Sequence, residues 1–241
     1  MIRSLIVMTA ALFAAVIPVV AAADPLRPPD GTYRYELRIA GAVAGQSTVV
    51  VRGGADAFVV DDDSRFTALK ISGHAIAHYA NASLALVSYS ADFVLPSGSQ
   101  HNDVTVAPGH MTIVAGSQHV DVAADPSAPL EILGDNLAGT AVIVPAIVQA
   151  AHATRFTYAA LSGGIAVPAT VVPDTIPARP IGLLSRDLWL VVDAGKIREV
   201  FWYNPATLVV DALDIPAQSI EFRLVDPIAS DRSPRDAPPA L

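Results

Sequence analysis

Apolar and polar residues alternate one by one through much of this chain, and this two-residue period constrains the fold more than any other feature. From Thr32 to Ile39, Tyr33, Tyr35 and Leu37 share one side with the final isoleucine, and polar residues take the other side. Successive side chains of a strand point to opposite faces, so the pattern is typical of a strand buried on one side. The segment from 32 to 39 therefore predicts a half-buried strand.

The same alternation recurs between residues that favour tight turns. Gly53-Gly54, Pro108-Gly109 and Gly116-Ser117 separate short alternating segments, and two longer ones run from Ala68 to Ala80 and from Leu84 to Leu95. Alternating segments joined by such turns indicate neighbouring antiparallel strands. In the last of these segments the predicted inward residues are Val87, Tyr89, Ala91, Phe93 and Leu95.

One long segment, residues 137–152, lacks this alternation. It is rich in alanine and valine, and Asp135-Asn136 precedes it as a candidate N-cap. Pro145 must bend this predicted helix or begin a second short one, because a proline inside a helix removes a hydrogen bond. The few polar residues do not share a face, so we expect the helical segment to be buried or covered.

These patterns predict a mainly β protein with one domain over residues 31–225. We expect a single, strongly curved antiparallel sheet, a half-barrel, around the short helical segment 137–152. A two-sheet sandwich is the alternative.

The first residues have the pattern of a secretory leader. Arg3 precedes an uncharged apolar stretch, and Ala21-Ala22-Ala23 provides a small-residue cleavage site before Asp24. We therefore expect a signal peptide over 1–23, a linker over 24–30 and a disordered, proline-rich tail over 226–241. A retained membrane anchor is the alternative for the leader, since its apolar stretch is just long enough to span a bilayer. Cleavage would leave an exported bacterial protein, periplasmic or secreted, with no stable membrane span.

Composition narrows the possible chemistry. The chain contains no cysteine, which excludes thiolate metal sites, iron–sulfur clusters and a cysteine nucleophile. Its formal net charge is −8, and no basic stripe interrupts this acidity, so nucleic acid is not an expected partner. No cofactor is expected, and protein partners are left open.

Histidine and aspartate supply the only candidate metal ligands. His74 and His78 share one side of a predicted strand, and His119 and Asp121 share one side of another. Together they form a hypothetical zinc-like site, against which a polar sheet face is favoured. The acidic run 61–63 lacks the spacing of a hard-ion loop, and we expect a solvated turn there.

Motifs for catalysis do not emerge from the sequence. It has no G-x-S-x-G elbow, no H-E-x-x-H helix and no glycine-rich phosphate loop after a strand. Enzymatic activity therefore stays uncertain and disfavoured. The aromatic run Phe201-Trp202-Tyr203, with Trp189 across the preceding hairpin, favours core packing over an exposed ligand platform.

Three degenerate motifs resemble a loose group of bacterial exported β-proteins of uncharacterised function. They are Tyr33-x-Tyr35 followed by Gly41-x-x-x-Gly45, then Asp135-Asn136-Leu137 before the helix, and the late hairpin from Asp187 to Ile197. The resemblance implies an envelope or secreted location and a strongly curved antiparallel sheet, similar to half-barrels that cradle apolar molecules. It implies no catalytic residues.

The leading functional hypothesis is therefore non-catalytic binding of an apolar or lipid-like molecule in the bacterial envelope. A structural or partner-binding envelope module without a small ligand is the second hypothesis, and a secreted hydrolase is the third. The hypothetical ligand site joins four helical residues to four strand residues. They are Val142, Ile143, Ile147, Val148, Leu37, Ile71, Tyr89 and Phe93.

Overall fold

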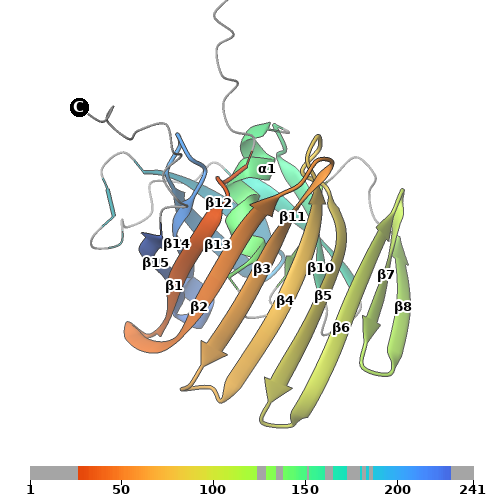
Figure 1. The fold of residues 1–241 in the computed structure, drawn as a ribbon, viewed down its shortest axis with the longest axis horizontal. Coiled ribbons are helices and arrows are strands. Elements are labelled where there is room, and N and C mark those ends of the chain that lie inside the picture. Colours follow the sequence, from red (N-terminus) through yellow and green to blue (C-terminus); the bar gives the residue numbers. More distant parts are fainter. Residues whose placement is uncertain are drawn as a thin grey trace, which may run out of the picture.

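A computed structural model describes residues 27–123, 129–133, 138–150, 152–160, 165–172, 180, 183–184 and 187–228. Its strands belong to one large curved sheet (Figure 1). They are β1 (Gly31–Ile39), β2 (Ala42–Gly53), β3 (Ala57–Phe66), β4 (Ile71–Ala80), β5 (Leu86–Leu95), β6 (Gly98–Ala107), β7 (His110–Ala115), β8 (Gln118–Ala123), β9 (Leu130–Leu133), β10 (Arg155–Ala160), β11 (Ile165–Val172), β12 (Leu188–Ala194), β13 (Ile197–Tyr203), β14 (Val210–Ile215) and β15 (Ile220–Ile228).

The strand order is β8-β7-β6-β5-β4-β3-β2-β1-β15-β14-β13-β12-β11-β10-β9. All neighbours pair antiparallel except β9 and β10, which are parallel. Strands β8 and β9 stand at the two ends of this order, so the sheet curves without closing into a barrel. This confirms the predicted single curved sheet and excludes the sandwich alternative.

A short helical segment lies on the concave side of the sheet (Figure 1). It consists of a 3-10 turn, η1 (Thr140–Ile143), followed by the α-helix α1 (Val144–Ala150). A second 3-10 turn, η3 (Pro216–Gln218), joins β14 to β15. No helix in the described ranges is long and apolar enough to cross a membrane.

The observed helix is shorter than the predicted segment 137–152. Its α-helical part begins at Val144, with Pro145 in the first turn, where a proline N–H would have no partner in the helix anyway. Of the two outcomes left open for Pro145, a bend or the start of a second short helix, the structure shows the second. His152 has a φ of +46° and lies beyond α1, which corrects the predicted end.

Alternation identified most inward residues, and the exception has a local cause. Tyr33, Tyr35 and Leu37 of β1 are buried as predicted. In β5 the pairing with β4 shifts by one residue, so Tyr79 lies opposite Leu86. This bulge buries Leu86 and leaves Val87 46% exposed, which corrects its predicted inward position.

A small second apolar cluster lies on the opposite face of the sheet from the main core. Trp189 of β12 and Trp202 of β13 are register partners, and their ring centroids are 5.8 Å apart. Trp202 is fully buried and packs with Val191, Val200 and Ala212. Core packing, rather than an open aromatic platform, is therefore the structural role of this aromatic run.

Candidate functional site: the filled concave face

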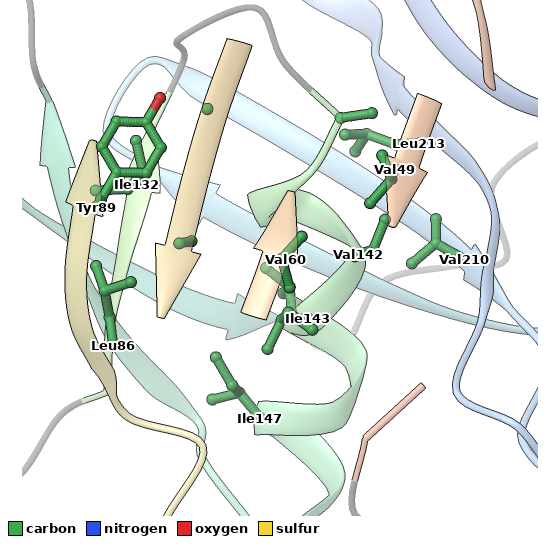
Figure 2. Packing of buried hydrophobic residues seen from close by; sticks show 14 of the residues in the cluster. Val49, Val60, Leu86, Tyr89, Ile132, Val142, Ile143, Ile147, Val210 and Leu213 are labelled. Atoms are coloured by element: carbon green, nitrogen blue, oxygen red, sulfur yellow. The ribbon is translucent and has the colours of Figure 1, made fainter. Parts of the chain in front are cut away.

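The helical segment fills the concave face with aliphatic side chains. Ile143 and Ile147 are 0% exposed, Val142 is buried, and Val148 is partly buried against the same cluster. Figure 2 shows Val142, Ile143 and Ile147 among residues from the two halves of the sheet, β1–β8 and β9–β15. The labelled neighbours include Val49, Val60, Leu86 and Tyr89 from the β1–β8 part, and Ile132, Val210 and Leu213 from the β9–β15 part.

The strand residues of the predicted ligand site belong to this cluster too. Leu37, Tyr89 and Phe93 are buried, and Ile71, at the start of β4, is partly buried against the same cluster. The structure therefore brings all eight predicted residues into one apolar core. In this conformation the helix covers the surface that a ligand would need.

A buried carboxylate lies where the helical segment meets the sheet. Asp62 of β3 accepts hydrogen bonds from the hydroxyls of Ser47 and Ser64 at 2.7 Å each, and from the backbone N–H of Gly139 at 2.6 Å. A Cβ at position 139 would lie 2.8 Å from the Cβ of Asp62, so a glycine is needed for this approach. Asp62 thereby fixes the start of the helical segment to β3.

The predicted solvated turn at 61–63 is therefore wrong. These residues lie inside β3, which alternates faces, so the middle acid points inward while Asp61 and Asp63 point outward. Burial raises the pKa of Asp62 from 3.8 to about 6, although its four hydrogen bonds, one of them from the Ala138 backbone, act to lower it.

Two further buried acids on the concave side are paired with tyrosines. The hydroxyl of Tyr79 donates to the two carboxylate oxygens of Glu131 at 2.8 and 3.0 Å, and the hydroxyl of Tyr158 donates to Glu199 at 2.7 Å. The backbone N–H of Ile132 donates to Glu131 at 2.9 Å. The tyrosine–glutamate bonds join β4 to β9 and β10 to β13. They therefore cross the interior between strands that do not pair with each other.

Burial changes the protonation of the second pair. It raises the pKa of Glu199 from 4.5 to about 7, against the opposing effect of the Tyr158 hydrogen bond. Burial, and next the charge of Glu199, raise the pKa of Tyr158 well above 10. Tyr158 is thus neutral at moderate pH, and Glu199 is largely neutral only below about pH 6. Covered and satisfied by hydroxyl donors, they hold strands together rather than present a base to a substrate from solvent.

The structure does not assemble the hypothetical metal site. His74 and His78 are exposed on β4, and His119 and Asp121 are exposed on β8. Four strand spacings, about 19 Å, separate the two pairs. His74 instead contacts Asp61, with 3.0 Å between Nε2 and Oδ1. Within the described residues no group of three or more histidine, aspartate or glutamate side chains could hold a metal ion.

Sequence reasoning missed the burial of Asp62, Glu131 and Glu199, although two of these acids carried a visible pattern. Residues 58, 60, 62, 64 and 66 alternate as one face, which places Asp62 with Phe58 and Phe66. Glu199 alternates in the same way with Ile197 and Phe201 of β13, whereas Glu131 lies in a segment without alternation. The tyrosine partners of both acids come from distant parts of the chain.

The fold and the site together define an open, curved antiparallel β-sheet protein whose concave face is filled by its own helix. A crystal structure from Brucella abortus, described as a beta-barrel-like protein of the domain of unknown function DUF1849, is similar to it. The two share 12% sequence identity and a TM-score of 0.49, over 83% of this chain and 97% of that chain.

A crystal structure of a DUF1089 family protein from Pseudomonas aeruginosa is also similar, with 10% identity and a TM-score of 0.39. That match covers 89% of this chain and 98% of the other. No protein-family profile matches the chain, and no curated protein matches it. Both similarities are to bacterial proteins.

Proposed function

We propose that this protein is an exported, non-catalytic binding protein of the bacterial envelope that takes an apolar or lipid-like molecule on its concave face. The observation that carries the proposal is the relation between α1 and the sheet. A seven-residue α-helix fills a concave apolar surface that the sheet does not close around. An acyl or prenyl chain offers the same aliphatic contacts as Val142, Ile143 and Ile147.

The helix is the element that a ligand would displace, because it is held by its apolar packing and by a few polar contacts at its two ends. Helices of this length are unstable in isolation, so its stability comes from burial of its apolar side chains. The preceding 3-10 turn has no side-chain cap, and neither has a charged residue that would favour its dipole. Its hydrogen bonds to the sheet in the described residues include one from the backbone N–H of Gly139 to the Asp62 carboxylate. Another runs from the Gln149 side-chain amide to the Tyr203 hydroxyl at 3.0 Å.

Export is part of the proposal and rests on the sequence alone. Residues 1–26 lie outside the described part of the chain, as do those after 228. We propose cleavage after Ala23, which N-terminal sequencing of the protein from its own envelope would detect. An intact Met1 in a membrane fraction would instead indicate a retained anchor.

The decisive experiment is a thermal-shift screen of the protein with fatty acids, phospholipids and polyprenyl carriers. Ligand that binds only the folded state raises the melting temperature as its concentration exceeds the dissociation constant. Hydrogen exchange over residues 138–150 should become faster with the same ligand, because the ligand replaces the helix. Native mass spectrometry of the protein from its own envelope would identify the bound molecule.

The competing function, a structural module without a small ligand, predicts a different result. Complete burial of Ile143 and Ile147 favours it, since such packing suits a permanent core. No thermal shift with any lipid, together with unchanged exchange of the helix, would remove the ligand proposal and leave the structural module.

A further inference from the structure

The two ends of the open sheet differ in what they offer to a partner. Strand β9 has four residues, and Leu130, Glu131 and Ile132 are all buried. Strand β8 has six residues, none of them buried, and within the described residues it pairs only with β7. An exposed edge strand presents unpaired backbone groups that can accept another strand. β8 is thus the more accessible edge, although part of it also lies near β11.

The hydrogen-bonding pattern identifies which backbone groups of β8 face outward. The N–H of Gly116 donates to the carbonyl of His101 at 2.9 Å, which extends the ladder between β6 and β7. Because ladder bonds alternate in direction, the β7 residues that face β8 are at positions 111, 113 and 115. Their register partners are Val122, Val120 and Gln118. The backbone groups of His119, Asp121 and Ala123 therefore point to the open edge.

The side chains on the convex face show how strands pair elsewhere in this sheet. Asp61 of β3 contacts His74 of β4 at 3.0 Å, and Asp92 of β5 contacts His101 of β6 at 2.8 Å. His119 and Asp121 place the same two residue types on the exposed face of β8. Asp121 accepts a hydrogen bond from the Thr112 hydroxyl at 2.6 Å, whereas His119 has no side-chain partner in the described part of the chain.

We propose that β8 is a self-association edge, which pairs antiparallel with β8 of a second copy around a two-fold axis through Val120. This register opposes His119 to the partner's Asp121, and Asp121 to the partner's His119. Both residues direct their backbone groups outward, so the register also satisfies the new ladder. A two-fold contact of this kind is self-complementary, since each residue pair occurs twice.

Neighbouring registers are less favourable. A shift by two residues in one direction opposes Asp121 to its own copy, and the opposite shift opposes His119 to its own copy. Two aspartates directly across two strands repel one another, and the register that opposes His119 to its own copy forms no histidine–aspartate pair. The chosen register also places half-buried Val120 against its copy on the concave side, which removes apolar surface from water. Charge complementarity and backbone pairing thus favour one occupant, a second copy of this chain.

Sedimentation equilibrium of the full chain over a wide concentration range tests the proposal. We expect reversible dimerisation, and His119→Asp or Asp121→His alone should weaken it about tenfold, because each opposes like side chains twice per dimer. An equimolar mixture of the two variants should recover association as a heterodimer. The double exchange, His119→Asp with Asp121→His, should recover it as a homodimer.

His78→Asp is the matched control, because His78 is an exposed histidine on the interior strand β4. It should leave association unchanged, and circular dichroism should show that all variants fold, since both changed side chains are exposed. A protein that stays monomeric at its highest soluble concentration would overturn the proposal. So would a dimer that both single variants leave unchanged, or a mixture that fails to recover association.

Discussion

The carboxylate of Asp62 accepts a hydrogen bond from the backbone N–H of Gly139 across 2.6 Å, although 77 residues separate them in the chain. One partner lies on β3 and the other directly precedes η1. The same carboxylate satisfies two serine hydroxyls from β2 and β3. A single acid thus joins two strands to the helical segment that fills their concave side.

Replacing this acid should be costly for stability. Asp62→Ala leaves the N–H of Gly139 and the hydroxyls of Ser47 and Ser64 buried without their acceptor. We expect a loss of about 3 kcal/mol in the free energy of unfolding, since each buried unsatisfied group costs about 1–3 kcal/mol. Chemical denaturation measures this loss. Asp63→Ala, on the exposed face of the same strand, is the control and should change stability by at most about 0.5 kcal/mol.

Stability should fall as pH rises from about 4 to about 7. The pKa values of Asp62 and Glu199 are about 6 and about 7 in the folded protein, above their ordinary values of 3.8 and 4.5. Between about pH 4 and about pH 7 the folded protein binds more protons than the unfolded chain, so raising the pH favours unfolding. The contribution of each acid is complete below its ordinary pKa and is lost as pH passes through its folded pKa.

Glu199→Gln should isolate one part of that dependence. A neutral amide can still accept the hydrogen bond from Tyr158, and it removes the cost of ionising a buried acid. Relative to the unmodified protein, the variant should gain about 2–3 kcal/mol of stability between pH 4.5 and pH 7. Denaturation at a series of pH values checks this. Parallel stability curves for the two proteins would contradict the assigned ionisation, and Asp63→Asn provides a surface control.

The helical residues should respond to truncation according to how permanently they are packed. Ile147→Ala should cost about 2–5 kcal/mol if α1 always fills the concave face, because the cavity cannot collapse fully. A milder loss would indicate a helix that already moves aside. Ile143→Asp should abolish folding or cost several kcal/mol, because it buries a charge among apolar groups. Val94→Ala, at an exposed position on β5, controls for shortening a side chain at the surface.

The Tyr79 and Glu131 pair should show strong coupling. Tyr79→Phe removes a hydroxyl that donates to both oxygens of a buried carboxylate. In a double-mutant cycle with Glu131→Gln, we expect an interaction energy of about 1–3 kcal/mol in the free energy of unfolding. A coupling near zero would mean that the two side chains contribute independently. Tyr33→Phe is the control, because its hydroxyl contacts only the backbone oxygen of Pro29.

Local alternation predicted the sheet well because the physical rule is local. In β1, apolar residues at every second position and turn residues at the end of the strand identified the inward side chains without knowledge of the neighbouring strands. The rule failed at Val87, where a bulge shifts the pairing by one residue. A bulge depends on the neighbouring strand, so one segment read alone does not reveal it.

The buried acids were missed for a different reason. An aspartate among three consecutive acids has the appearance of solvated surface, and its burial becomes acceptable only when donors from other parts of the chain join Ser64 around it. Gly139 and Ser47 become neighbours of Asp62 through the tertiary fold. The helix length was overestimated similarly, because composition indicates where a helix is tolerated and its contacts determine where it ends.

The pairing of β1 with β15 makes this chain a natural candidate for circular permutation. Thr32 lies opposite Ile228, so a short linker could join the two ends of the sheet's central pair. New ends between β8 and β9 would give a chain that runs from β9 to β15 and then from β1 to β8. Every strand would then pair with its neighbour in sequence, which lowers the contact order without changing the sheet. Such a permutant should fold faster than the natural chain, because in the natural chain β1 pairs with β15, the strand most distant from it in sequence.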